Sequence, residues 1–213
     1  MTTPKIKICG IHTQDALEAA ISARADYVGF NFYPPSPRYV DARGTAELGE
    51  RADGRIARVG VFVDEKDAEI SEVVEAARLN AIQLHGDETP ERAAQLRSRF
   101  GLPVWKVIAV ASESDLSRAD TYRQAADFIL FDAKTPKGTL PGGMGLSFDW
   151  ALLKAYRGAM PWGLAGGLTP DNVAQAAQLT GAPLVDAASG TESAPGVKDV
   201  DKIAAFCKAA RQP

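Results

Sequence analysis

Residues 161–198 read PWGLAGGLTPDNVAQAAQLTGAPLVDAASGTESAPGVK, and this stretch decides the fold. It contains two short apolar runs, Trp162–Ala165 and Pro183–Ala188, which continue into Gly166-Gly167 and Ser189-Gly190. Small residues at a strand end let backbone N–H groups approach a ligand, and a helix that starts there adds partial positive charge. Two such ends in succession are typical of the phosphate site after the seventh and eighth strands of a β/α barrel.

The segment between the two runs is expected to be a helix. Thr169 is predicted as its N-cap and Pro170 as its first helical residue, since these residue types favour those positions. The alternative is that both glycine-containing ends are ordinary tight turns that bind nothing. The phosphate interpretation therefore depends on whether the rest of the chain forms a barrel.

The whole chain alternates strands and helices, which favours a parallel sheet. The expected strands are Lys5–Cys9, Tyr27–Tyr33, Ile56–Val63, Ala81–Leu84, Val104–Ala109, Phe128–Phe131 and the two runs above. The expected helices are Thr13–Arg24, Ala42–Arg51, Glu65–Leu79, Thr89–Phe100, Ser114–Gln124, Phe148–Tyr156, the one after Thr169, and Asp199–Arg211, with a Gly/Pro-rich loop at Lys134–Gly145. Eight such units predict a single-domain α/β fold over residues 1–213, a (β/α)8 TIM barrel. The absence of a G-x-G-x-x-G fingerprint after the first strand weakens the Rossmann alternative.

Composition restricts the function classes. The 213 residues are close to the lower limit of such a barrel, about 200 residues. A net charge of −3 gives no reason to expect nucleic acid or an anionic membrane as a partner. No apolar run approaches a membrane span, and the first residues do not resemble a signal peptide. Cys9 and Cys207 lack metal-ligand spacing and are expected to be reduced thiols in a cytoplasmic protein.

Function is sought at the carboxyl ends of the strands. Cys9 ends the first strand, and alternation places Lys7 and Cys9 on the inward face while Ile6 and Ile8 face the helices. A buried lysine needs a partner, and one about 7 Å along the strand from Cys9 would favour the thiolate. The plain alternative is that Cys9 is a small buried hydrophobic residue.

Other strand ends carry polar side chains with two interpretations each. Asp132 and Asp186 are either acids at the barrel mouth or salt-bridge partners, and Asp64 also ends a strand. His85 is an acid–base group or a hydrogen-bonded structural histidine. Arg38, in the proline-stiffened loop YPPSPRY, is a solvated charge or a carboxylate clamp.

Taken together, the motifs resemble one family closely, phosphoribosylanthranilate isomerase of tryptophan biosynthesis. The matching motifs are Lys7-Ile8-Cys9-Gly10, Gly29-Phe30-Asn31-Phe32, Ser36-Pro37-Arg38-Tyr39, Gln83-Leu84-His85-Gly86-Asp87, Phe131-Asp132-Ala133-Lys134, Gly142-Gly143-Met144-Gly145, Phe148-Asp149-Trp150, Ala165-Gly166-Gly167-Leu168, and Ser189-Gly190 through Pro195-Gly196-Val197-Lys198-Asp199. They run from Lys7 to Asp199, nearly the whole chain.

The resemblance implies an aldose–ketose isomerase, of the intramolecular oxidoreductase type, that performs an Amadori rearrangement. It converts N-(5-phosphoribosyl)anthranilate to 1-(2-carboxyphenylamino)-1-deoxyribulose 5-phosphate. At matching positions it implies Cys9 as general base, Asp132 as general acid and Arg38 as the holder of the anthranilate carboxylate. Backbone groups of Gly166, Gly167, Ser189 and Gly190 would hold the phosphate. From the strand ends we also expect Asp186 to contact the substrate, with Lys7 and His85 in support. No cofactor or metal is implied, and the protein is expected to be a monomer or homodimer.

The sequence departs from the family pattern at three places. His12 and Met144 each stand where a threonine is common, and Ala188 stands where the family often has a serine near the phosphate. None of these touches Cys9, Asp132 or Arg38. Two other functions stay open: another phosphosugar isomerase, such as the histidine-pathway aminoaldose enzyme, and a non-catalytic barrel that binds a phosphorylated ligand.

Overall fold

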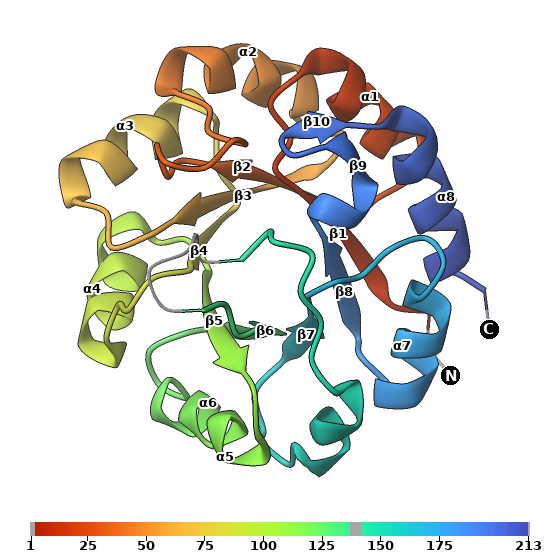
Figure 1. Cartoon of the computed structure of the whole chain (residues 1–213). Helices are drawn as coiled ribbons and strands as arrows, with labels where there is room; N and C mark the ends of the chain where they lie inside the picture. Colours follow the sequence, from red (N-terminus) through yellow and green to blue (C-terminus); the bar gives the residue numbers. More distant parts are fainter. Residues whose placement is uncertain (1–2, 137–141, 213) are drawn as a thin grey trace.

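Eight parallel strands close into a barrel in the order of the chain, with helices around the outside (Figure 1). The computed structural model describes residues 3–136 and 142–212, so residues 137–141 of the predicted loop at Lys134–Gly145 lie outside the described residues. The strands are β1 Lys5–Cys9, β2 Tyr27–Asn31, β3 Ala57–Phe62, β4 Ala81–Leu84, β5 Val104–Val110, β6 Phe128–Ala133, β7 Trp162–Leu164 and β8 Leu184–Ala187. The ring closes where β1 pairs with β8, with Lys7 opposite Asp186. The predicted (β/α)8 barrel is confirmed.

Side chains alternate across each strand as predicted. Ile6 and Ile8 belong to the large core between the strands and the helices. A second, smaller core fills the barrel itself and includes Val59, Trp105 and Leu130. Because Leu130 faces this inner core, Asp132 two residues later points to the inside of the barrel mouth.

The described chain contains eight α-helices and two short 3₁₀ helices. They are α1 Gln14–Ser22, α2 Ala42–Ala52, α3 Asp67–Ala76, α4 Pro90–Phe100, α5 Glu113–Leu116, α6 Arg118–Thr121, η1 Trp150–Ala155, α7 Val173–Thr180, η2 Ser189–Thr191 and α8 Val200–Ala210. A small antiparallel hairpin, β9 Glu192–Ala194 with β10 Val197–Lys198, follows β8 and was not predicted. None of the described helices is long and apolar enough to cross a membrane.

The predicted start of the seventh helix is wrong. The helix begins at Val173 with Asn172 as its N-cap, three residues after Pro170. The Asn172 side chain explains the delay, since it accepts from the Thr169 N–H at 2.8 Å and donates to the Gly167 carbonyl at 2.9 Å. These bonds stabilise a turn that competes with the first helical turn.

Two other predicted helices are less regular than expected. The segment predicted at Ser114–Gln124 is divided into α5 and α6, and the hydroxyls of Ser117 and Thr121 each bond to a carbonyl three residues back. The segment predicted at Phe148–Tyr156 forms only the 3₁₀ helix η1. Its position is determined by tertiary packing, because the Tyr156 ring contacts Phe131 and Trp162.

Replacing Asp199 with Ala should lower the free energy of unfolding by about 1 kcal/mol. The Asp199 carboxylate caps α8, accepting from the N–H groups of Asp201 and Lys202 at 3.0 Å each. Urea denaturation measures the loss. Asp201→Ala is the matched control, because it removes the same charge two residues away without removing a cap. Equal destabilisation by both changes would contradict the capping role.

Candidate active site

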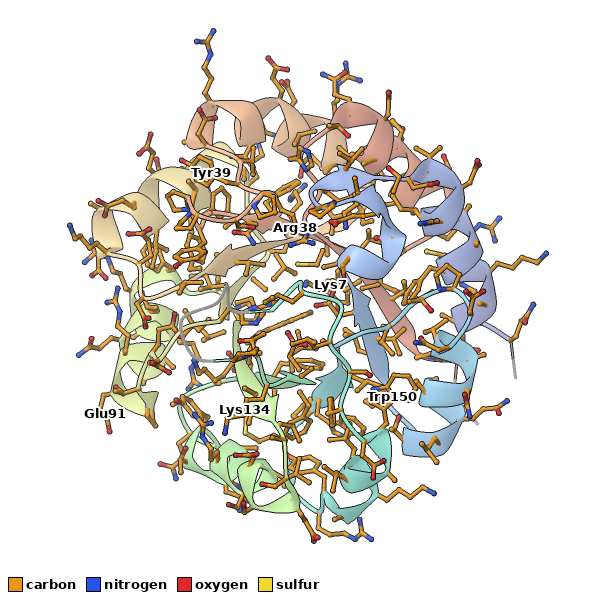
Figure 2. All side chains as sticks on the ribbon, viewed as in Figure 1. Lys7, Arg38, Tyr39, Glu91, Lys134 and Trp150 are labelled. Atoms are coloured by element: carbon orange, nitrogen blue, oxygen red, sulfur yellow. The ribbon has the colours of Figure 1, made fainter. Side chains whose placement is uncertain are left out.

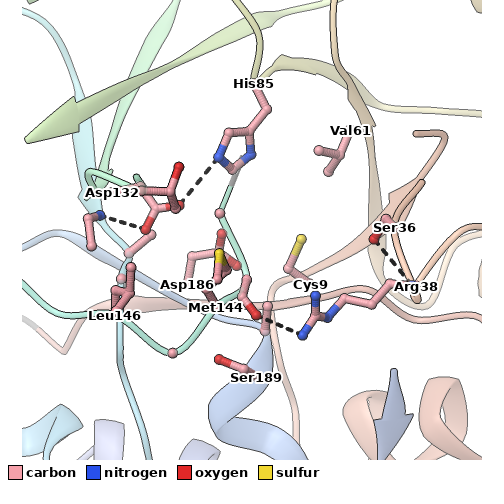
Figure 3. Close-up of a pocket in the computed structure, with 18 of the residues that line it drawn as sticks. Cys9, Ser36, Arg38, Val61, His85, Asp132, Met144, Leu146, Asp186 and Ser189 are labelled. Atoms are coloured by element: carbon pink, nitrogen blue, oxygen red, sulfur yellow. Dashed lines mark hydrogen bonds and ion pairs between the residues drawn. The ribbon is translucent and has the colours of Figure 1, made fainter. Parts of the chain in front are cut away.

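One pocket lies at the carboxyl ends of the strands, inside the ring of helices (Figures 2 and 3). Of the residues singled out from the sequence, its lining contains Cys9, Arg38, His85, Asp132, Gly166, Gly167, Asp186 and Ser189. Lys7, two residues before Cys9 on β1, and Gly190 are not part of this lining. Asp64 is not part of the lining either, since its carboxylate accepts from the Asp87 N–H at 2.9 Å.

Lys7 and Asp186 form a buried ion pair beneath Cys9. Lys7 Nζ donates to Asp186 Oδ2 at 2.9 Å, and the lysine is fully buried. Asp186 Oδ1, also buried, has no hydrogen-bond partner in the described chain. Although burial disfavours the ammonium, Asp186 and Cys9 together raise the pKa of Lys7 above its ordinary value. Lys7 therefore stays charged inside the barrel.

Cys9 is packed closely by its surroundings. A Cβ on Gly29 would lie 2.8 Å from Cys9 Sγ and 3.2 Å from Lys7 Nζ, so glycine is needed on β2 to leave room for both side chains. Burial raises the pKa of Cys9, and the opposing effect of Lys7 does not offset it. Lys7 favours the thiolate as expected, but burial of Cys9 has the larger effect on its pKa.

Asp132 occupies the other side of the pocket, at the end of β6 (Figure 3). Its Oδ1 accepts from the Ala133 N–H at 2.7 Å, and its Oδ2 lies 3.3 Å from His85 Nε2. A Cβ on Gly166 would approach Oδ1 to 2.9 Å, so this glycine lets β7 lie against the carboxylate. His85 Nδ1 in turn lies 3.4 Å from the amide nitrogen of Gln83. One carboxylate oxygen of Asp132 therefore accepts a backbone hydrogen bond, and the other faces the ring nitrogen of His85.

Arg38 is buried and has partners that the sequence did not indicate. Its Nε and Nη2 donate to Glu192 Oε1 and Oε2 at 2.7 and 2.8 Å, and Nη2 also donates to the Gly143 carbonyl at 2.9 Å. The open alternative of a solvated loop arginine is therefore wrong. Glu192 was missed because it is 154 residues away in sequence, and a single glutamate after a turn gives no signal of its own.

Two turns form the remaining wall of the pocket. Gly166 and Gly167 have φ of +86° and +66°, a conformation that favours glycine. In the described chain neither of their N–H groups donates to another backbone carbonyl. Ser189 and Gly190 lie against this turn, since a Cβ on Gly190 would lie 1.9 Å from the Leu168 carbonyl oxygen. Because α7 starts only at Val173, an anion here would contact turn backbone rather than the first turn of that helix.

The described residues contain no group of three or more His, Cys, Asp or Glu side chains that could hold a metal ion.

Comparisons with known proteins agree over nearly the full length. Residues 6–209 match the family model described as N-(5'-phosphoribosyl)anthranilate (PRA) isomerase. The protein of that name from Paramagnetospirillum magneticum is 54% identical over 208 residues, which is 97% of each chain. The phosphoribosyl anthranilate isomerase structure from Thermotoga maritima has a TM-score of 0.88 at 38% identity, covering 97% of this chain and 98% of that one. A structure of such an isomerase with reduced 1-(o-carboxyphenylamino)-1-deoxyribulose 5-phosphate has a TM-score of 0.85 at 36% identity, with the same coverage. The chain therefore belongs to the N-(5'-phosphoribosyl)anthranilate isomerase family.

Proposed function

We propose that this protein catalyses the Amadori rearrangement of N-(5-phosphoribosyl)anthranilate to 1-(2-carboxyphenylamino)-1-deoxyribulose 5-phosphate, the isomerase step of tryptophan biosynthesis. The observation that carries the proposal is the full-length family match. The pocket adds support, because it places a thiol, a carboxylic acid and an arginine around one cavity. The ligand in the similar structure is a reduced form of the proposed product.

Asp132 is the proposed general acid. It donates a proton to the furanose ring oxygen while the bond from that oxygen to C1 breaks, and the anilino nitrogen supplies the electron pair that forms the C1–N double bond. The product of this step is a protonated imine with a free hydroxyl at C4. The neighbouring His85, 3.3 Å from Asp132 Oδ2, is a polar partner for the carboxylate before and after the proton moves.

Cys9 is the proposed general base. Its thiolate takes the proton from C2, the C2–H electrons form a C1–C2 double bond, and the imine becomes an enamine. The resulting enol tautomerises to the ketone at C2, with a proton added at C1. C1 is reduced and C2 oxidised within one molecule, so the atoms and electrons balance with no external cofactor. Lys7 is the cation that stabilises the thiolate from below.

The two anionic ends of the substrate fit two different parts of the pocket. The phosphate is placed at the turns Gly166-Gly167 and Ser189-Gly190, where backbone N–H groups and αL glycines suit an anion. The carboxylate is placed at Arg38. Asp186 Oδ1, buried and without a partner in the described chain, is the proposed acceptor for a sugar hydroxyl between them.

The direct test is an assay of the purified protein for loss of the fluorescence of the anthranilate ribosyl phosphate. A catalysed loss that requires protein supports the proposal. No catalysed loss by folded protein, combined with phosphate binding, would instead favour the non-catalytic barrel. Light scattering on the same sample decides between the predicted monomer and homodimer; the similar isomerase from Thermotoga maritima is described as dimeric.

Replacing Arg38 with Ala should raise the substrate KM by about 10–100-fold, because a charge-assisted contact to a carboxylate is worth roughly 1.5–3 kcal/mol. The Ki for inorganic phosphate should stay within about twofold. Glu192 keeps Lys198 as a partner at 3.1 Å, so the change does not leave that buried carboxylate unpaired. Arg55→Ala, in an exposed ion pair with Glu18, is the control. Equal weakening of phosphate would mean that Arg38 supports the whole pocket rather than the carboxylate.

A further inference from the structure

Glu192, which is not part of the pocket lining, forms two hydrogen bonds with Arg38. The two hydrogen bonds, from Nε to Oε1 and from Nη2 to Oε2, form a bidentate pair that fixes the plane of the guanidinium as well as its position. The second N–H of Nη2 is taken by the Gly143 carbonyl. In the described chain this leaves Nη1 as the terminal nitrogen without an acceptor, and Figure 3 shows the guanidinium of Arg38 beside Cys9 in the pocket.

Glu192 is itself fixed on every side. Lys198 Nζ lies 3.1 Å from its Oε1, and the Gly196 N–H donates to its Oε2 at 3.2 Å. Its own backbone carbonyl accepts from Lys202 Nζ at 2.8 Å. Burial raises the pKa of Glu192, but the Arg38 hydrogen bonds and the charges of Lys198 and Arg38 outweigh it and hold the pKa below its ordinary value. The carboxylate is thus charged and has little freedom to rotate.

Lys198 completes the cluster. Besides its ion pair with Glu192, its Nζ donates to the Ala188 carbonyl at 2.7 Å and to Thr191 Oγ1 at 3.1 Å. Its side chain is 1% exposed, and those of Glu192 and Arg38 are 3% and 6% exposed. Arg38 and Lys198 contribute two positive charges and Glu192 one negative charge. Burial lowers the pKa of Lys198, and the charges of Glu192 and Cys9 oppose this lowering. With Lys198 protonated, the three side chains carry one more positive than negative charge, which a bound anion would offset.

We propose that Glu192, held by Lys198, is a positioning residue for Arg38, which it orients so that Nη1 receives the carboxylate of an anionic aromatic substrate. The inference rests on the proposed function, because it assumes that Arg38 binds that carboxylate. The excess positive charge of the cluster also gives a reason for selectivity, because an aromatic ring with a carboxylate should bind better than a ring without one.

Two competitive inhibitors test this directly: the reduced carboxyphenylamino-deoxyribulose phosphate and the same compound with an unsubstituted phenyl ring. In Glu192→Gln the amide has only one acceptor oxygen, and its NH2 group faces donors, so the bidentate pair is lost. The Ki of the carboxylated inhibitor should rise about tenfold or more, and the Ki of the phenyl compound should change less than about twofold. In an Arg38→Ala background, Glu192→Gln should have no further effect on either Ki.

Several results would overturn the inference. They are an equal loss for both inhibitors, tighter binding of the carboxylated one, or an undiminished effect of Glu192→Gln when Arg38 is already Ala. Glu18→Gln, in an exposed ion pair far from the pocket, is the matched control and should change neither Ki. If Arg38→Ala discriminates between the inhibitors and Glu192→Gln does not, the carboxylate site stands and the positioning role fails. If Arg38→Ala does not discriminate, the carboxylate site of the proposed function fails as well.

If Glu192→Gln does not fold, Lys198→Met is a second variant for the same test. Methionine fills similar space without the ammonium, so the cluster becomes neutral while the Arg38–Glu192 pair remains. The Ki of the carboxylated inhibitor should again rise selectively. A loss shared equally by the phenyl compound would show that Lys198 and Glu192 support only the hairpin β9–β10, which would overturn the inference.

Discussion

Replacing Cys9 with Ser should lower kcat by about 10²–10⁴-fold, the range expected when a general base is removed. A serine hydroxyl has nearly the same shape but is a far weaker base near neutral pH. Because Cys9 Sγ is surrounded by Gly29 and Lys7, the variant should keep the structure of the pocket. The substrate KM should therefore change little, since Cys9 is proposed to act on the reacting carbon rather than on either anionic end.

The pH profile gives the same prediction a second readout. Burial raises the pKa of Cys9, so the thiolate fraction in the wild type grows as pH rises through that pKa. The rate at which iodoacetamide modifies Cys9 in the wild type should accordingly increase with pH.

Alkylation distinguishes the two thiols. Burial raises the pKa of both thiols, but Cys9 lines the pocket and is 9% exposed, whereas Cys207 is 1% exposed in α8. Iodoacetamide should therefore modify Cys9 faster, and the reduced product should protect it. Turnover by the serine variant at close to the wild-type rate would transfer the role of base to His85.

Much of the architecture could be predicted from local signals. Period-two alternation put Lys7 and Cys9 inside the barrel and Ile6 and Ile8 outside it, and the structure confirms both placements. Strand ends followed by small residues located the pocket, because parallel strands bring all their carboxyl ends to one rim. The helix starts were harder: Thr169 and Pro170 have the right residue types for a cap, but the side chain of Asn172 stabilises a competing turn.

The partners of the site residues could not be predicted in the same way. The Lys7–Asp186 pair joins β1 to β8 across 179 residues, and only the closure of the barrel brings them together. Glu192 and Lys198 lie in a hairpin with no strand-like run of its own, so their charges suggest surface residues. In the structure both side chains are buried: Glu192 pairs with Arg38, and Lys198 pairs with Glu192. Charge pairing over long sequence separation is set by topology, and one sequence does not contain that information in any local pattern.

Replacing Asp132 with Asn should lower kcat by about 10²–10⁴-fold and leave KM nearly unchanged, because proton donation to the ring oxygen matters mainly in the transition state. Asparagine is well suited to this site. Its carbonyl oxygen can still accept from the Ala133 N–H, as Oδ1 does at 2.7 Å, and its NH2 group can face His85 Nε2, as Oδ2 does at 3.3 Å. The variant therefore keeps the local contacts and loses only the ability to give up a proton as an acid.

Steady-state kinetics on the folded variant measure this effect, and the Ki of the reduced product checks that the pocket is intact. Asp127→Asn, which changes the same side chain at the opposite end of the barrel where Asp127 accepts from the Val104 N–H, is the matched control and should keep wild-type kcat. Acid catalysis by Asp132 requires a large fall in kcat with an unchanged Ki. A kcat within tenfold of wild type would remove Asp132 from the acid role, and Asp186 would then be the next carboxylate to test, since its Oδ1 is buried in the pocket with no partner in the described chain.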